Sequence, residues 1–184
     1  GFIGVSLDVI SFPIIGIGIN LLIKEFKNKN HYFFEKFYNL TSKQVYFTSL
    51  NILKNHALAE EITQDVYVKF LSEISSFKEY YNVFSYLTTI SRNLSINVYN
   101  KNKKIINDEE IINFTKYDDS TIDDLNAQEI LSLIEDTSSR EIVVYHVIFE
   151  YTFLQISKIM KVPLGTILWK YNKTMKYLKD RIKL

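Results

Sequence analysis

Cationic side chains recur at helical spacing from Lys161 to the end of the chain. Lysines occupy positions 161, 170, 173, 176, 179 and 183, together with Arg181, and the only acid among them is Asp180. Side chains three or four residues apart lie on one face of a helix. Lysines on such a face could bind the phosphates of a nucleic acid and displace its counterions. Charge alone also allows a solvated basic face with no ligand.

The segment in front of these lysines has the signals of two helices joined by a short turn. Thr152, with Gln155 three residues later, fits a capping box at the start of the first helix. Residues 161–163 would form the turn, and Pro163 suits the first position of the second helix. The side chains expected on the buried face of that helix are Ile167, Tyr171, Leu178 and Ile182. The pattern predicts a helix-turn-helix whose second helix lies in a major groove.

The opposite face of the second helix would then meet DNA. Gly165 has no side chain, so the backbone could approach a DNA strand closely there. For Trp169 two interpretations are held equal: a contact with DNA, or a hydrophobic contact with a neighbouring domain or an inhibitor. The expected contact residues of this unit are Thr152, Pro163, Leu164, Gly165, Thr166, Trp169, Lys170 and Lys173.

The rest of the chain is predicted to be helical as well. The 184 residues are 47% hydrophobic, and five glycines and two prolines are too few for a fold built on tight hairpin turns. Apolar residues recur at three- and four-residue steps over 31–104, with expected breaks at 40–44, 54–61 and 77–83. Two further helices are expected after 124, split near Thr137, with Ser138 or Ser139 as the N-cap of the second.

The predicted fold is all-α, with two small helical domains, residues 31–104 and 125–184, joined by an acidic linker over 105–124. The linker holds seven acids against one lysine, and like charges at this density resist packing: Asp108, Glu109, Glu110, Asp118, Asp119, Asp123 and Asp124. A solvated loop is the simpler interpretation. An acidic mimic of a nucleic-acid strand, or a spacer threading a basic channel, is the alternative.

Residues 1–30 are an apolar N-terminal extension whose role the sequence leaves open. Only Asp8 is charged before Lys24, and Pro13 interrupts a stretch of barely the length that a membrane span needs. The segment could pack loosely, form a helix against the next domain or tether the chain to a membrane.

The sequence contains no pattern typical of an enzyme. Cysteine is absent, which excludes thiolate metal sites, and His31, His56 and His146 are far apart in the sequence. No phosphate-binding loop or nucleophile–base pair is present. We therefore expect a non-enzyme with no metal and no cofactor. The net charge of +1 gives no information on a nucleic-acid partner.

Three separated stretches resemble bacterial RNA polymerase sigma factors of the extracytoplasmic-function type. The segments LQISKIMKVPL and GTILWKYNKTMKYL are similar to the C-terminal DNA-binding region of that family. The segment ALAEEITQDVYVKFL (57–71) resembles its second conserved region, and FSYLTTISRNLSINVYNKNKK (84–104) the adjoining promoter-melting helix. The sequence departs from the family at Asn97 (often Asp), Asn100 (often Arg) and 168–170, where Leu-Trp-Lys replaces a basic run.

This resemblance implies a protein that binds core RNA polymerase, directs it to a promoter and helps to open the duplex. Glu60, Glu61, Gln64 and Asp65 would bind an arginine-rich coiled coil of the core's largest subunit; without the resemblance they would be a solvated face. The residues expected to bind promoter DNA in the first domain are Tyr80, Tyr81, Tyr86, Thr89, Arg92, Asn93, Asn97, Lys101, Lys103 and Lys104. Phe77 and Phe84 are expected in the core.

The implied partners are core RNA polymerase, duplex and melted promoter DNA, and an anti-sigma factor, with a cytoplasmic location. The main alternative function is a helix-turn-helix transcription regulator that never binds polymerase. An enzyme and a membrane-tethered sensor are more distant alternatives.

Overall fold

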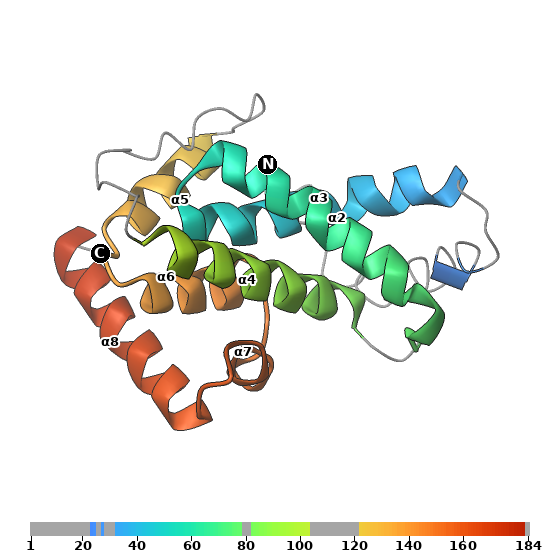
Figure 1. Ribbon diagram of the computed structural model, residues 1–184. Helices are drawn as coiled ribbons and strands as arrows, with labels where there is room; N and C mark the ends of the chain where they lie inside the picture. The colour runs from blue at the N-terminus through green and yellow to red at the C-terminus, as the bar shows by residue number, and fades with distance from the viewer. Residues whose placement is uncertain (1–22, 25–26, 28–31, 79–81, 104–121, 183–184) are drawn as a thin grey trace. The chain divides into compact units, whose positions relative to one another are not determined.

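The computed structural model describes residues 23–24, 27, 32–78, 82–103 and 122–182. Every regular element within these ranges is a helix, which confirms the all-α prediction. The chain divides into two compact units, with the boundary near residue 110 (Figure 1).

The first unit is built from α2 (Tyr32–Leu53), α3 (His56–Glu73), the short η1 (Ile74–Ser76) and α4 (Val83–Asn102). The three long helices pack pairwise on one another (Figure 1). Their shared core is rich in aromatic rings. Phe37 stacks on Phe70 at 5.1 Å between ring centroids, and Phe70 meets Phe77 edge to face at 5.7 Å. Phe77 is buried and Phe84 packs against the same core, as expected.

Helix α2 runs through residues 40–44, where a break was predicted, so that prediction is wrong. The reason lies in Thr41. Its hydroxyl donates to the carbonyl of Phe37 one turn earlier (2.8 Å) and lies 2.5 Å from the Tyr67 hydroxyl on α3. These bonds satisfy the buried hydroxyl within a continuous helix. Burial also raises the pKa of Tyr67, so this tyrosine remains protonated.

Two asparagines set where α3 and α4 begin. Asn55 accepts a hydrogen bond from the Leu58 amide (2.9 Å), and Asn82 accepts one from the Ser85 amide (3.1 Å). Each therefore satisfies a helix N–H that would otherwise have no partner. Helices α2 and α4 approach through small side chains. The hydroxyls of Ser49 and Ser91 are 2.8 Å apart, and Ser91 also donates to the Val45 carbonyl (2.9 Å).

The second unit contains α5 (Ile122–Ser132), α6 (Thr137–Val143), the π-helical turn η3 (Val144–Ile148), α7 (Phe153–Met160) and α8 (Leu164–Ile182). The expected split near Thr137 is present, but the N-cap of α6 is Asp136 rather than Ser138 or Ser139. Asp136 Oδ2 accepts hydrogen bonds from the Ser139 amide (2.9 Å) and hydroxyl (2.7 Å). A carboxylate at a helix N-terminus is also favoured by the helix dipole.

Helices α7 and α8 are joined by a tight turn. The predicted capping box is confirmed: Gln155 N donates to Thr152 Oγ1 (3.1 Å), and Thr152 N donates to Gln155 Oε1 (2.9 Å). Lys161 ends α7 in the left-handed conformation, at φ 55° and ψ 43°. The Pro163 carbonyl accepts the first bonds of α8, so this proline caps the helix from one position earlier than expected. In Figure 1, α7 is seen end-on while α8 runs across the view, so the two cross.

Parts of two predicted segments lie outside the described residues. These are the N-terminal extension up to residue 22 and most of the acidic linker, whose last residues, 122–124, lie within α5. Among the described residues, no helix combines the length and the apolar character that a membrane crossing requires.

Candidate nucleic-acid interface

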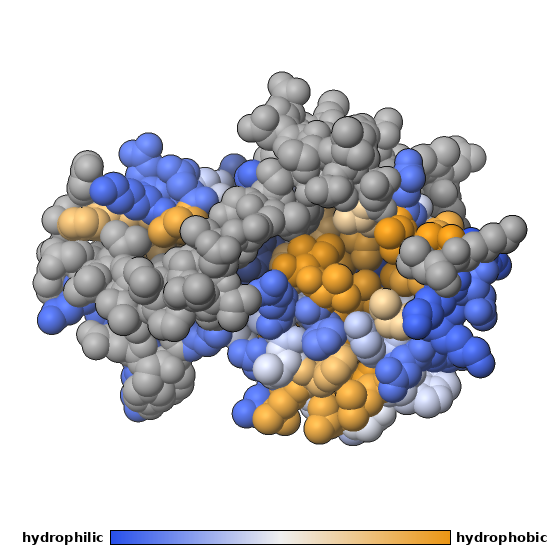
Figure 2. Space-filling model, turned by 180° about the vertical axis from the view of Figure 1, so that it is seen from behind, coloured by the Kyte–Doolittle hydropathy of each residue, from blue (hydrophilic) through white to orange (hydrophobic). Residues whose placement is uncertain are grey.

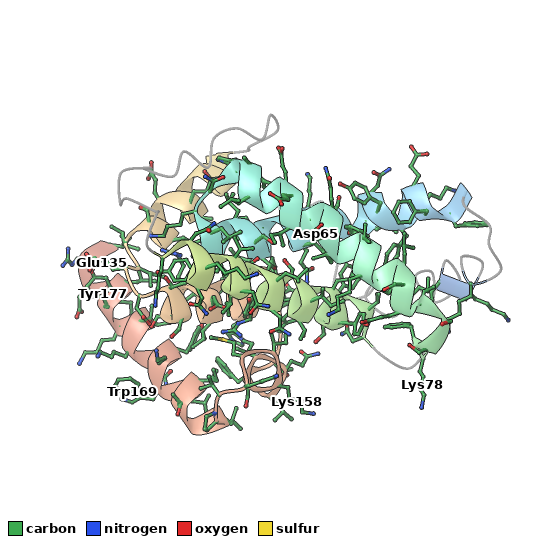
Figure 3. The ribbon with its side chains drawn as sticks, in the orientation of Figure 1. Asp65, Lys78, Glu135, Lys158, Trp169 and Tyr177 are labelled. Atoms are coloured by element: carbon green, nitrogen blue, oxygen red, sulfur yellow. The ribbon has the colours of Figure 1, made fainter. Side chains whose placement is uncertain are left out.

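The outer face of α8 is solvent-exposed over most of its length. Ile167, Thr174 and Leu178 are buried against the unit. Thr166, Trp169 and the lysines of the last turns are exposed on the other side, as the cationic stripe predicted. In Figure 3, Trp169 and Tyr177 project from α8 away from the other helices of the unit.

Lys170 differs from the other lysines of this face because it has a partner on α6. Its Nζ lies 3.3 Å from Asp136 Oδ2 and also donates to the Ser138 hydroxyl. The lysine side chain is 29% exposed. The Ser139 hydroxyl bond, with help from the Ser139 amide and Lys170, lowers the pKa of Asp136 to about 2, although partial burial opposes the shift. Asp136 therefore carries a full charge at neutral pH, and Lys170 ties α8 to the start of α6.

The start of α8 is open to solvent. Leu164, Gly165 and Thr166 are exposed, and nothing lies within 4 Å of the position that a Cβ on Gly165 would occupy. Thr152 is exposed but serves as the cap of α7. Asn172, exposed three residues after Trp169, was missed by the sequence analysis. Its spacing from Trp169 and Lys176 would have revealed it, because steps of three and four residues share one helix face.

The second expected interface follows the surface of α4. Asn93, Asn97 and Lys101 are exposed at four-residue steps, as predicted, and Asn100 is exposed nearby. Lys103 Nζ lies 5.6 Å above the Tyr99 ring. The asparagines thus present amide groups along α4, and Lys101 and Lys103 present ammonium groups at its end.

The remaining members of the predicted α4 set are less accessible or lie outside the described residues. Arg92 and Thr89 are half-buried, and Thr89 Oγ1 donates to the Ser85 carbonyl (2.8 Å). Tyr80, Tyr81 and Lys104 lie outside the described residues, so the structure does not place them.

Tyr86 does not belong to the exposed stripe, contrary to expectation. Its ring is half-buried, 5.2 Å from Phe77 and 6.1 Å from Phe70 between centroids, and its hydroxyl donates to Glu73. Burial and the bond to the Glu73 carboxylate raise the pKa of Tyr86 to about 12. The side chain thus joins the aromatic core to the end of α3.

The acidic face of α3 is exposed as predicted. Glu60, Glu61, Gln64 and Asp65 all face solvent, while Ile62 and Val66 are buried. Figure 3 shows Asp65 on this helix. The face continues into Val68, an apolar side chain that is 67% exposed. The described residues contain no group of histidines and acids that could hold a metal ion.

Comparisons with known proteins agree with this arrangement. Residues 37–105 match the family described as Sigma-70 region 2. The structure resembles the sigma factor RpoE from Bartonella quintana, solved with the anti-sigma factor NepR, at a TM-score of 0.64 and 18% identity, over 82% of this chain and 97% of that one. It also resembles CnrH, solved with the cytosolic domain of CnrY, at a TM-score of 0.63 and 12% identity, over 89% of this chain and 96% of that one.

No curated protein sequence matches the chain. The family match covers most of α2 and the whole of α3 and α4. Residues 37–105 therefore match the sigma-70 region 2 family, and the fold of the chain resembles the folds of the sigma factor RpoE and of CnrH.

Proposed function

We propose that this protein is an alternative sigma factor that binds core RNA polymerase through α3, holds melted promoter DNA along α4 and docks α8 on the duplex upstream. The observation that carries the proposal is the region 2 match, which spans α3 and α4 and thus both of the exposed polar faces of the first unit. Catalysis then remains with the polymerase, and the protein acts in the cytoplasm beside the chromosome.

The acidic face of α3 supports a basic protein partner. Glu61 and Asp65 are four residues apart, so their carboxylates line up along the helix. A partner helix with arginines at the same spacing could form paired, charge-assisted hydrogen bonds with them. The exposed Val68 at the end of this row would add apolar contact area that a purely solvated face does not need.

The surface of α4 supports binding to a single strand. Asn93 and Asn97 can donate to and accept from base edges once the bases are unpaired. Lys101 and Lys103 would meet the phosphates of the same strand, and this part of the affinity should fall as salt rises. Tyr80 and Tyr81 remain candidates for stacking on an unpaired base.

Initiation from a promoter in a purified system tests this function. Purified core polymerase is incubated with the chain on genomic fragments, and run-off transcripts are measured with and without it. We expect specific transcripts only when both are present. The matched control is a variant with Glu61→Lys and Asp65→Lys, which should lose core binding while retaining affinity for upstream duplex DNA.

One alternative follows from the helix-turn-helix unit, because α7 and α8 alone would also suit a regulator that never contacts polymerase. Failure of the tagged chain to retain core polymerase in a pull-down, together with retained DNA binding, would favour the regulator.

An anti-sigma factor is a further expected partner, in line with the complex in which the Bartonella protein was solved.

A further inference from the structure

The first two turns of α8 lack the side chains that usually recognise guanine and adenine. Residues 164–171 are Leu-Gly-Thr-Ile-Leu-Trp-Lys-Tyr, without arginine, asparagine or glutamine. Those types form the paired hydrogen bonds that identify guanine and adenine in the major groove. A lysine can bind guanine, but Lys170 is held by Asp136 on α6.

Apolar groups stand where those polar side chains are absent. Leu164 is 40% exposed, Leu168 36% and Trp169 59%. Figure 2, the view from behind, shows apolar side chains gathered at the lower edge, where α7 and the start of α8 lie. The open position at Gly165 lets the backbone come close to a ligand, and Lys173 lies over the Trp169 ring at 4.8 Å, beside the apolar group.

Thymine is the base whose major-groove edge suits this surface. It is distinguished there by its C5 methyl group, which makes apolar contacts with protein side chains. We propose, on the basis of the sigma-factor function above, that α8 recognises the upstream promoter element through thymine methyl groups, with Leu168 and Trp169 as specificity-determining residues. Lys173 and Lys176 bind the flanking phosphates, and Asn172 binds an adenine at the edge of the element.

Deoxyuridine provides the test, because it differs from thymidine only in lacking the methyl group. The holoenzyme first selects its upstream element from a pool of random duplexes. The thymidines of that element are then replaced by deoxyuridine, and affinity is measured by competition. We expect an element dominated by A·T pairs and about a fourfold loss of affinity for each contacted methyl group. The same replacement outside the element should leave the affinity unchanged.

Variants assign the effect to α8. Leu168→Ala with Trp169→Ala should bind thymidine and deoxyuridine duplexes equally, with the salt dependence unchanged. Leu154→Ala removes an exposed apolar side chain from α7 instead, and this variant should keep the full difference in affinity between thymidine and deoxyuridine duplexes. Circular dichroism of each variant checks that it is folded.

Several outcomes would overturn the proposal while leaving the sigma-factor function intact. These are an upstream element made of G·C pairs, equal affinity of the unaltered holoenzyme for the two bases, and a thymidine preference that survives in the double variant. If the double variant binds DNA normally but loses affinity for core polymerase, the patch is a protein-binding surface. Failure of the holoenzyme to select any element would instead refute the proposed function itself.

Discussion

Asp136 combines two roles that substitution can separate. It caps α6 through Ser139, and it pairs with Lys170 on α8. Asparagine is as good an N-cap as aspartate, whereas alanine cannot cap, and loss of a cap costs about 0.5–2 kcal/mol. The ion pair contributes at most about 1 kcal/mol, because both partners are partly exposed and water screens their attraction. We therefore expect Asp136→Ala to destabilise α6 by about 0.5–3 kcal/mol and Asp136→Asn by less than about 1 kcal/mol.

Amide hydrogen exchange of α6 and α8 in the 184-residue chain measures the free energies of local unfolding of these two helices. Lys170→Met completes a double-mutant cycle with Asp136→Asn, and its coupling energy isolates the pair. Acidification adds a second test. The pKa of Asp136 in the folded chain, about 2, lies below its ordinary value of 3.8, so the stability gained from the ionised carboxylate is present above pH 3.8 and is lost as pH falls toward 2. An equal loss of stability in Asp136→Ala and Asp136→Asn would refute this division of roles. So would a stability of Asp136→Asn that falls with acid as in the unaltered chain.

Three further predictions follow from exposure and contacts. Charge reversal at Glu61 and Asp65 should weaken core binding at least tenfold at low salt and less at high salt, measured by fluorescence anisotropy; insensitivity to salt would exclude an electrostatic contact. Tyr86→Phe should lower the free energy of unfolding by about 1 kcal/mol in a urea titration while leaving promoter opening unchanged, since its hydroxyl binds Glu73. Lys173→Ala with Lys176→Ala should flatten the plot of log affinity against log salt concentration by the amount expected for the loss of about two phosphate contacts. An unchanged slope would show that these lysines of α8 do not contact the duplex.

Local signals made much of the second unit predictable. The Thr152–Gln155 capping box and the turn at 161–163 depend on neighbouring residues, so their sequence pattern was sufficient. The cap of α6 was harder, because Asp136, Ser138 and Ser139 can all serve as caps and only tertiary structure decides among them. The partner of Lys170 could not be inferred, since Asp136 is distant in sequence and nothing local specifies the pairing.

Predictions for the first unit failed where tertiary contacts overrode local preference. Residues 40–44 looked like a helix break, yet Thr41 is buried and bonded to Tyr67, which keeps α2 continuous. Tyr86 was placed on the outer stripe by spacing alone, but the rings of Phe70 and Phe77 extend the core around that side of α4. The acidic row of α3 was predictable because Ile62 and Val66 fix which side of that helix is buried.

The close approach of α2 and α4 at Ser49 and Ser91 limits how this protein can be engineered. Both residues are fully buried and neither is expected to touch DNA or polymerase. A larger side chain at either position would wedge the helices apart and displace the asparagines that α4 presents on its far side. Saturation mutagenesis for altered promoter choice should therefore leave these two serines untouched, since a change there would affect every sequence preference at once.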